Sequence, residues 1–213
     1  MPTIVEHTLY TFDELSDRAK EIARDWWRQC ENDDFDAEYV IEDAERMGAI
    51  LGIEFDTRRV QLMSGATRTE PRVYWSGFSS QGDGAQFEGR YAYAKGAPAK
   101  IKKETGGTDS ELYRIALDLQ ATQKRNRYRL EARTDCKRAQ YSHSGWMNVE
   151  VWADTDRDIG DAESEITRAL RDFADWIYRQ LESEYEWRMA DEQVDDAILA
   201  NEYTFDENGH RAN

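Results

Sequence analysis

The chain of 213 residues is poor in the residues that build disulfide scaffolds and zinc sites. It has two cysteines, Cys30 and Cys136, which lie in separate segments and form no Cys-x-x-Cys pair. Its three histidines, His7, His143 and His210, form no His-x-x-x-His pair. These spacings argue against a disulfide scaffold and against a zinc site. We therefore expect a protein that needs no metal or other cofactor and that resides in a reducing cytoplasm.

Long apolar segments are also absent from the sequence. No run of 18 apolar residues occurs, and residues 1–7 show neither a basic region nor an apolar run. Aliphatic residues are modest in number, but 7 Trp, 11 Tyr and 7 Phe supply a core, because each aromatic side chain buries roughly 150–250 Å². The sequence therefore predicts a soluble protein without a cleaved signal or a membrane partner.

Acidic residues are abundant and are sorted along the chain. Residues 1–56 carry 16 acidic and 5 basic side chains, residues 57–153 carry 10 and 17, and residues 154–213 carry 18 and 6. The net charges of these segments are −11, +7 and −12, which gives −16 in total. We interpret residues 1–153 as an α+β core and residues 154–213 as a long acidic helix and tail packed on the same domain. Such sorting predicts a surface with a dense negative field.

The spacing of apolar residues predicts an α+β fold. Helical spacing indicates two N-terminal helices, a middle helix that begins after Thr108 or Asp109, and a long C-terminal helix marked by Ile166 to Leu181. Alternating patterns between residues 53 and 152 indicate strands, and residues 80–85 join two aromatic-rich runs as a hairpin. We expect an antiparallel sheet of about five or six strands with the helices packed mainly on one face.

Several local patterns refine this prediction. Thr11 and Glu14 have the spacing of a capping box at the start of the first helix. Arg58 and Arg59 mark a slip in the strand alternation, and Lys100 to Lys103 is interpreted as a basic connector. The pentapeptide at residues 10–14 recurs at residues 203–207, where a turn should follow it. Five residues are too few to indicate a domain duplication.

One candidate ligand site is the hairpin loop together with arginines on other segments. The loop offers Ser79, Ser80, Gln81 and Asp83 between glycines, whose backbone N–H groups can approach an anion. The segment from Arg127 to Arg133 alternates as a strand and places Arg127 and Arg129 on one side, and Arg90 lies on another strand. These residues suggest a sponge that sequesters a small nucleotide messenger. The alternative is an ordinary turn beside the polar face of a half-covered sheet.

A second candidate is a hydrolase built around His143. This histidine is the only one in the structured middle of the chain, and Cys136 or a neighbouring serine is the available nucleophile. Adjacent residues of a strand point to opposite faces, so Ser142 or Ser144 makes a poor local pair with His143.

The third candidate is the acidic face of the helices. Asp17 and Glu21 in the first helix, and Asp172, Asp175, Glu182 and Glu186 in the C-terminal helix, are expected outside the apolar stripes. Acidic helices serve solubility in many proteins, but solubility needs a net charge of only roughly 2 to 8 on a small domain. A chain at −16 repels nucleic acid at long range, so direct nucleic-acid binding is disfavoured. The expected partner is a protein or ribonucleoprotein with a basic groove.

Two stretches carry a resemblance to known proteins. The helix at residues 12–27 and the hairpin at residues 75–84, with the sequence Trp-Ser-Gly-Phe-Ser-Ser-Gln-Gly-Asp-Gly, resemble small acidic proteins encoded by tailed bacteriophages and prophages. The resemblance implies a phage origin and a bacterial host cytoplasm, and it brings no catalytic residues. In that setting, acidic proteins without enzymatic motifs are often inhibitors of host defence, including anti-CRISPR proteins and mimics of DNA. By this analogy the protein is a non-enzymatic inhibitor that occupies the nucleic-acid groove of a host defence complex.

Overall fold

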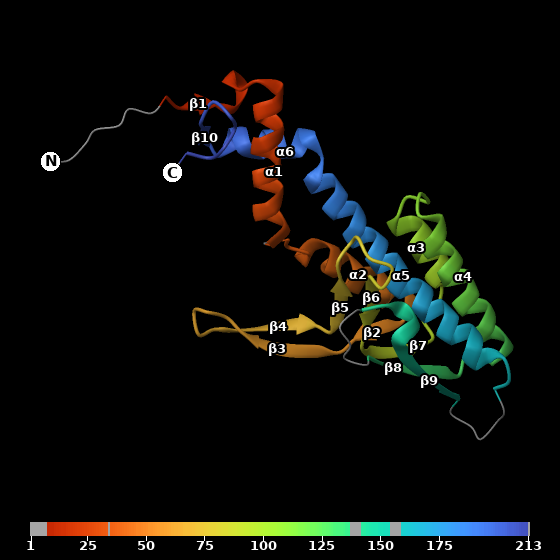
Figure 1. The fold of residues 1–213 in the computed structure, drawn as a ribbon. Helices are drawn as coiled ribbons and strands as arrows, with labels where there is room; N and C mark the ends of the chain where they lie inside the picture. Colours follow the sequence, from red (N-terminus) through yellow and green to blue (C-terminus); the bar gives the residue numbers. More distant parts are fainter. Residues whose placement is uncertain (1–7, 34, 137–141, 154–158, 213) are drawn as a thin grey trace. The chain divides into compact units, whose positions relative to one another are not determined.

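The structure is a computed structural model that describes residues 8–33, 35–136, 142–153 and 159–212 (Figure 1). The chain divides into two compact units. Unit 1 combines residues 1–36 with residues 182–213, and unit 2 comprises residues 37–181. The division that the charge pattern suggests after residue 153 therefore falls inside unit 2.

The helices of unit 2 present apolar stripes to its core. They are α2 (Glu38–Leu51), α3 (Ala97–Glu104), α4 (Ser110–Arg125) and the part of α5 (Ala162–Met189) that ends at Leu181. Asp109 caps α4, because its carboxylate accepts a hydrogen bond from the N–H of Leu112 at 2.8 Å. The predicted inward positions of α4 and α5 are all buried: Leu112, Ile115, Ala116, Leu119, Ile166, Leu170, Phe173, Ile177 and Leu181.

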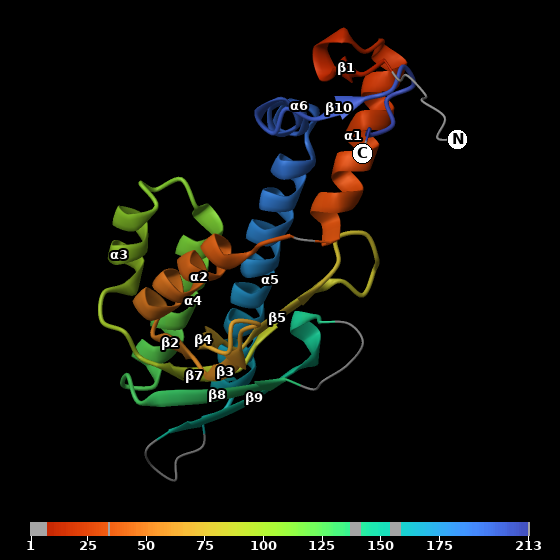
Figure 2. The ribbon, with the colours of Figure 1, turned by 90° about the vertical axis from the view of Figure 1, so that its left-hand side faces the viewer.

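Four strands of unit 2 form its main sheet. They are β2 (Ile53–Phe55), β7 (Gly89–Ala92), β8 (Leu130–Cys136) and β9 (Met147–Ala153), antiparallel in the order β2-β7-β8-β9. Figure 2 shows the helices of unit 2 on one side of this sheet. Phe173 of α5 contacts Phe55 and Phe87, with ring centroids 6.3 and 5.8 Å apart. The predicted α+β class, with antiparallel strands, is confirmed.

The other strands of unit 2 form separate pairs. β3 (Thr57–Gln61) pairs with β4 (Thr67–Pro71), and β5 (Val73–Ser76) pairs with β6 (Gly84–Phe87). The β5–β6 pair is the predicted hairpin, with Trp75 opposite Ala85. The main sheet thus has four strands, not the five or six that the sequence predicts. The reason is that three extended segments each change partner part-way along.

The change of partner occurs at one place, which we call the three-strand junction and which consists of Asp56, Arg72 and Glu88. The N–H of Asp56 donates to the carbonyl of Glu88 at 2.9 Å, Glu88 to Arg72 at 3.0 Å, and Arg72 to Asp56 at 2.7 Å. These hydrogen bonds close a ring in which each residue gives one donor and one acceptor, so no backbone group is left unpaired in the ring. The slip expected at Arg58 and Arg59 therefore lies earlier, at Asp56.

Side chains of the same residues reinforce the junction. The guanidinium of Arg72 lies 2.5 Å from the carboxylate of Glu88. The Asp56 carboxylate accepts a hydrogen bond from Arg133 of β8 at 2.5 Å. The pKa of Arg72 is raised from its ordinary value, mainly by the hydrogen bond to Glu88. The charges of the junction are therefore paired with one another and with the main sheet.

Two segments of unit 2 differ from the sequence prediction. Lys100 to Lys103 lie inside α3 and not in a connector, and Pro98 stands in the first turn of that helix, where its missing N–H costs nothing. The strand predicted from Arg127 begins only at Leu130. Arg127 and Tyr128 have φ angles of 57° and 61° and form the turn after α4. The buried side-chain amide of Gln123 fixes the start of β8, because it forms hydrogen bonds with the backbone N–H and carbonyl of Leu130.

Unit 1 has a small core of its own. Its elements are β1 (Tyr10–Thr11), η1 (Phe12–Glu14), α1 (Asp17–Asp33), the end of α5, α6 (Asp191–Ala200) and β10 (Thr204–Phe205). The buried residues are Phe12, Leu15, Ala19, Ala23, Val194, Ile198 and Phe205. The predicted phase of α1 is confirmed at its centre, whereas Cys30, expected on the inner stripe, is exposed. The capping box is present, but it closes η1: the N–H and hydroxyl of Thr11 both donate to Glu14.

The repeated pentapeptide has a structural role in unit 1. β1 and β10, which belong to the two copies, pair antiparallel with Thr11 opposite Thr204 and Tyr10 opposite Phe205. Thr11 and Thr204 are equivalent positions of the repeat, so the two copies meet about a local two-fold axis. The second copy then turns as predicted, with Asp206 accepting hydrogen bonds from the N–H groups of Asn208 and His210.

A methyl group at Gly89 tests the three-strand junction. A Cβ atom there would lie 2.3 Å from the carbonyl oxygen of Glu54 and 3.1 Å from Cα of Phe55, so backbone must move. We expect Gly89→Ala to lower the free energy of unfolding of unit 2 by about 3 kcal/mol, measured by urea denaturation. The control is Gly65→Ala in the β3–β4 turn, which has open space and a φ of 83° and should cost about 1 kcal/mol. Equal losses would contradict the close strand approach.

Trp26 tests the core of unit 1. Its ring lies 5.1 Å from Tyr203 and 6.0 Å from Phe205, and the guanidinium of Arg211 lies 5.0 Å above it. Trp26→Ala should lower the local stability of α1 and α6 by about 3 kcal/mol, read from the exchange of their amide hydrogens. Glu21→Gln, on the exposed side of α1, should change it by no more than about 0.5 kcal/mol. Similar effects of the two substitutions would show that the phase of α1 is wrong.

Candidate functional site

The negative charge of the protein is concentrated in unit 1. Its 68 residues carry 20 acidic and 6 basic side chains, a net charge of −14. Unit 2 carries 24 acidic and 22 basic side chains, a net charge of −2. Almost the whole charge of −16 thus belongs to one third of the chain, which is assembled from its two ends.

Three arginines of unit 1 make contacts within the unit. Arg24 of α1 makes two hydrogen bonds to Asp195 of α6, at 2.6 and 2.7 Å, and its pKa is raised mainly by that carboxylate. Arg28 donates to the backbone carbonyl of Met189 at 3.1 Å. Arg211 lies over the rings of Trp26 and Tyr203. These three positive charges therefore take part in contacts within unit 1, and an excess of carboxylates remains at its surface.

The predicted acidic residues of unit 1 differ in their surroundings. Asp17 and Glu186 are exposed, and the described residues offer neither of them an ion-pair partner. Glu21 is exposed but pairs with Arg24, and Glu182 is half-buried. Further exposed carboxylates lie around them, at Asp13, Glu192, Asp196, Glu202 and Glu207. The sequence prediction named none of these as partner-binding, although their helical or turn positions gave a usable signal.

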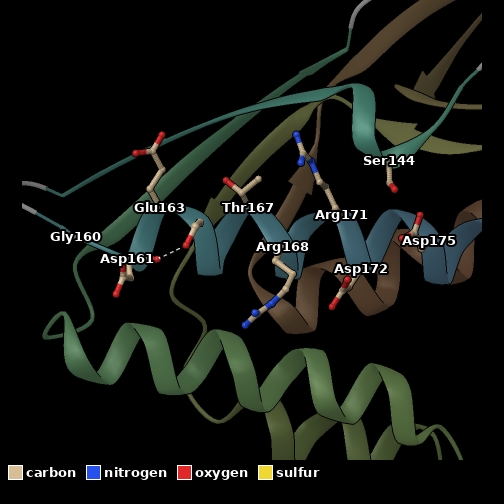
Figure 3. A pocket seen from close by; sticks show the side chains of 10 residues that line it. Ser144, Gly160, Asp161, Glu163, Thr167, Arg168, Arg171, Asp172 and Asp175 are labelled. Atoms are coloured by element: carbon tan, nitrogen blue, oxygen red, sulfur yellow. Dashed lines mark hydrogen bonds between the residues drawn. The ribbon is translucent and has the colours of Figure 1, made fainter.

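Asp172 and Asp175 lie in unit 2 and line a cavity beside α5. The cavity has a volume of about 560 Å³ and is lined by Ser144, Gly160, Asp161, Glu163, Ser164, Thr167, Arg168, Arg171, Asp172 and Asp175 (Figure 3). Figure 3 shows Arg168 and Asp172 leaving α5 on one side and Thr167 and Arg171 on the other. Asp172 accepts a hydrogen bond from Arg114 at 2.8 Å. The walls carry both signs of charge, so this part of α5 does not present a purely acidic surface.

The hairpin loop uses its own carboxylate to bind its backbone donors. Oδ2 of Asp83 accepts hydrogen bonds from the N–H groups of Ser79 at 2.9 Å and Ser80 at 2.7 Å. These two hydrogen bonds, that of Ser80 first, lower the pKa of Asp83. Gln81 is exposed at the tip. Because a fixed negative charge already occupies the donors, the loop has the geometry of a self-capped turn and is poorly suited to a phosphate.

The arginines of the sponge hypothesis are not gathered at that loop. Arg127 and Arg129 are exposed in the turn between α4 and β8, next to the end of β7, where Ala92 pairs with Glu131. The loop precedes β6, at the other end of the β6–β7 segment. Arg90 is exposed on β7, opposite Glu54 and Arg133. Contacts among the described residues do not bring these groups together around one ligand.

His143 and Cys136 lack the features of a base and a nucleophile. Nδ1 of His143 accepts a hydrogen bond from the N–H of Gly145 at 3.0 Å, so in the neutral ring Nε2 carries the proton and is a donor. Burial raises the pKa of Cys136 to about 12, with smaller contributions from Glu88 and Asp135. Since the thiolate is the reactive form, this thiol is unreactive near neutral pH. Among the described residues, no cluster of three His, Cys, Asp or Glu side chains is arranged to hold a metal ion.

A family model now places the chain among known sequences. The model of a domain of unknown function, DUF8835, matches residues 37–191. The chain belongs to the DUF8835 family. No curated protein and no solved structure matches it. In the part of the chain that the structure describes, every helix is too short or too polar to cross a lipid bilayer.

The DUF8835 match follows the division into units closely. It spans all of unit 2 and only the ten residues of unit 1 from Glu182 to Asp191. Helix α1 and the chain beyond Asp191 lie outside the matched DUF8835 domain. The acidic unit is thus built mainly from segments that flank the family domain.

Asp83 provides a test of the loop within the DUF8835 domain. Asp83→Ala removes the acceptor of two N–H groups and should lower the free energy of unfolding by about 1 kcal/mol at pH 7. A carboxylate with a lowered pKa stabilises the fold fully above its ordinary pKa of 3.8 and loses this effect as the pH falls through the lowered value. The difference between parent and variant should therefore shrink in acid, measured by urea denaturation at several pH values.

Exposed Glu131 on β8 supplies the control for this measurement. Glu131→Ala should stay within about 0.5 kcal/mol of the parent at pH 7. A loss for Asp83→Ala that is independent of pH would show that the Asp83 carboxylate does not hold the loop.

Proposed function

We propose that the protein acts without catalysis, by binding a positively charged macromolecular partner through the acidic surface of unit 1. The observation that carries the proposal is the net charge of −14 on the 68 residues of unit 1, whereas the 145 residues of unit 2 carry only −2. Solubility needs a net charge of only roughly 2 to 8 on a small domain. Self-repulsion of this size opposes compaction, so a function that uses the charge is the simplest reason for it to persist.

The internal contacts of unit 1 support this proposal. Arg24 and Arg28 on α1 both bond to groups of the C-terminal segment, and Arg211 lies over aromatic rings. Their charges are screened from a partner, whereas exposed carboxylates such as Asp17 and Glu186 face solvent. A partner with a basic groove would meet a field of one sign, and its attraction would fall as salt rises.

The class of partner follows from the same charge. A surface of closely spaced carboxylates resembles the phosphate backbone in charge, so proteins and ribonucleoproteins that hold nucleic acid in a basic groove fit it best. With the bacteriophage setting that the sequence resemblance implies, we propose a defence complex of the bacterial host as the partner and inhibition of that complex as the outcome. The host cytoplasm is the corresponding location.

A charge-reversal experiment tests the acidic surface. The variant changes four exposed carboxylates of unit 1, Asp17, Glu186, Asp196 and Glu207, to Lys. The control changes four exposed carboxylates of unit 2, Glu54, Glu131, Glu150 and Glu163, to Lys, and so has the same net charge. The immobilised proteins capture partners from a bacterial lysate, and mass spectrometry quantifies them. The parent should retain nucleic-acid-binding proteins that added duplex DNA displaces.

The two variants should then behave differently. We expect the unit 1 variant to retain at least roughly tenfold less of these proteins than the parent, because several charge contacts of the partner are reversed together. The control should retain them at a similar level to the parent. Equal retention by both variants would rule out unit 1 as the binding surface, and insensitivity to added DNA would rule out the groove.

A further inference from the structure

The β3–β4 hairpin is an arm that projects from unit 2 (Figure 1), and its Arg68 donates a hydrogen bond to Glu38 of α2 at 3.3 Å. All residues from Gln61 to Thr69 are exposed, including Leu62 and the fully exposed Met63 at the tip. In the described part of the chain, no third strand pairs with β3 or β4. A two-stranded hairpin on its own is only marginally stable in water. The arm therefore has two free backbone edges and little burial of its own.

The hydrogen-bond register shows which backbone groups point away from the arm. The N–H of Leu62 donates to Ala66 at 2.8 Å, and that of Arg72 to Asp56 at 2.7 Å. Bonded and non-bonded pairs alternate in an antiparallel ladder, so residues 58, 60, 68 and 70 point their backbone groups inward. On the outer edge of β4, the outward groups belong to Thr67, Thr69 and Pro71. On the outer edge of β3, they belong to Thr57, Arg59 and Gln61.

From this register we infer that a second copy of the chain pairs with the arm along the edge of β4. An antiparallel pair centred on Thr69 places the two Thr69 residues opposite each other, where each N–H donates to the other carbonyl. Thr67 of each copy then donates to the carbonyl of Pro71 in the other copy. Pro71 has no N–H, so it supplies only the carbonyl of this pair, and the carbonyl of Thr67 stays open to water. The result is a continuous four-stranded sheet in the order β3-β4-β4-β3.

The side chains on β4 are complementary to themselves in this register. Arg68 of one copy lies directly opposite Glu70 of the other, and the reverse pair lies on the other side of the two-fold axis. Within one copy, Arg68 already bonds Glu70 at 2.7 Å, and Arg58 lies 3.2 Å from Glu70. The pairing therefore extends an existing charge network. Self-pairing of β3 about Arg59 would instead place Arg59 opposite Arg59, which disfavours that edge.

Charge also favours the arm as the place where two copies meet. Each copy carries −16, so the bodies repel one another, but residues 57–71 contain three arginines and one glutamate. Contact through the arm thus places segments of net positive charge, and not the acidic segments, at the interface.

Removal of one outward N–H gives the first test. Thr69→Pro deletes both central hydrogen bonds of the proposed interface but leaves the bonds between β3 and β4, since Thr69 points outward. Arg59→Pro, directly opposite on the β3 edge, is the matched control. Sedimentation equilibrium should show that the full-length parent dimerises, that Thr69→Pro raises the dissociation constant at least roughly tenfold, and that Arg59→Pro does not. A parent that stays monomeric at its highest soluble concentration, or equal effects of the two prolines, would overturn the inference.

Charge swapping gives the second test and does not depend on the backbone. Arg68→Glu places like charges opposite one another in its own dimer, and so does Glu70→Arg. Each variant alone should be monomeric, whereas an equimolar mixture should form a mixed dimer that native mass spectrometry identifies by mass. Failure of the mixture to associate, or dimers of either variant alone, would contradict the register. Association of the parent with duplex DNA in place of a second copy would overturn the proposal as well.

Discussion

The ring of backbone hydrogen bonds among Asp56, Arg72 and Glu88 is the constraint on which the architecture of unit 2 depends. Three extended segments meet there, and because each residue is satisfied in the ring, each segment can leave with a different neighbour. Beyond the junction, β2 pairs with β7 in the main sheet, β5 pairs with β6 as a hairpin, and β3 pairs with β4 as the exposed arm. The Arg72–Glu88 pair and the Arg133–Asp56 bond fix the charges of the junction. The main sheet is thus short because its strands are shared with two other structures.

Local sequence patterns predicted the elements that interactions between residues close in sequence determine. The apolar stripe of α5 and the hairpin around residues 80–85 follow from short-range chemistry, and the structure confirms them. Of the two caps that the sequence offered for α4, Thr108 and Asp109, the structure has Asp109. The junction was not predictable in this way, because Asp56, Arg72 and Glu88 look like ordinary polar strand positions until three segments meet. Helix α3 was missed because its eight residues include three lysines and only one large aliphatic side chain, Ile101. Arg127 was placed in a strand because its positive φ leaves no trace in an alternating pattern.

The excess of acidic residues was visible in the sequence, but the folded unit that carries it was not. Division into segments along the chain assigned −11, +7 and −12, whereas the folded units carry −14 and −2. The difference arises because residues 37–56 and 154–181 fold with the basic middle of the chain, and their carboxylates meet its arginines. Glu165 with Arg125 and Asp172 with Arg114 are such pairs. In unit 2 the acidic charge is therefore nearly balanced by basic residues, and the surplus resides in unit 1.

The pairing of Thr11 with Thr204 has a consequence for the order of folding. These residues are 193 positions apart, so at roughly 5 to 20 residues per second a ribosome needs about 10 to 40 s between them. During that interval α1 has neither α6 nor β10 to cover its apolar side, whereas every strand of unit 2 is synthesised before the interval ends. Unit 2 can therefore fold first. The segment that connects the two parts of unit 1 is then already folded, so unit 1 does not have to close a long flexible loop. The acidic surface consequently assembles last, on chains whose DUF8835 domain has been completely synthesised.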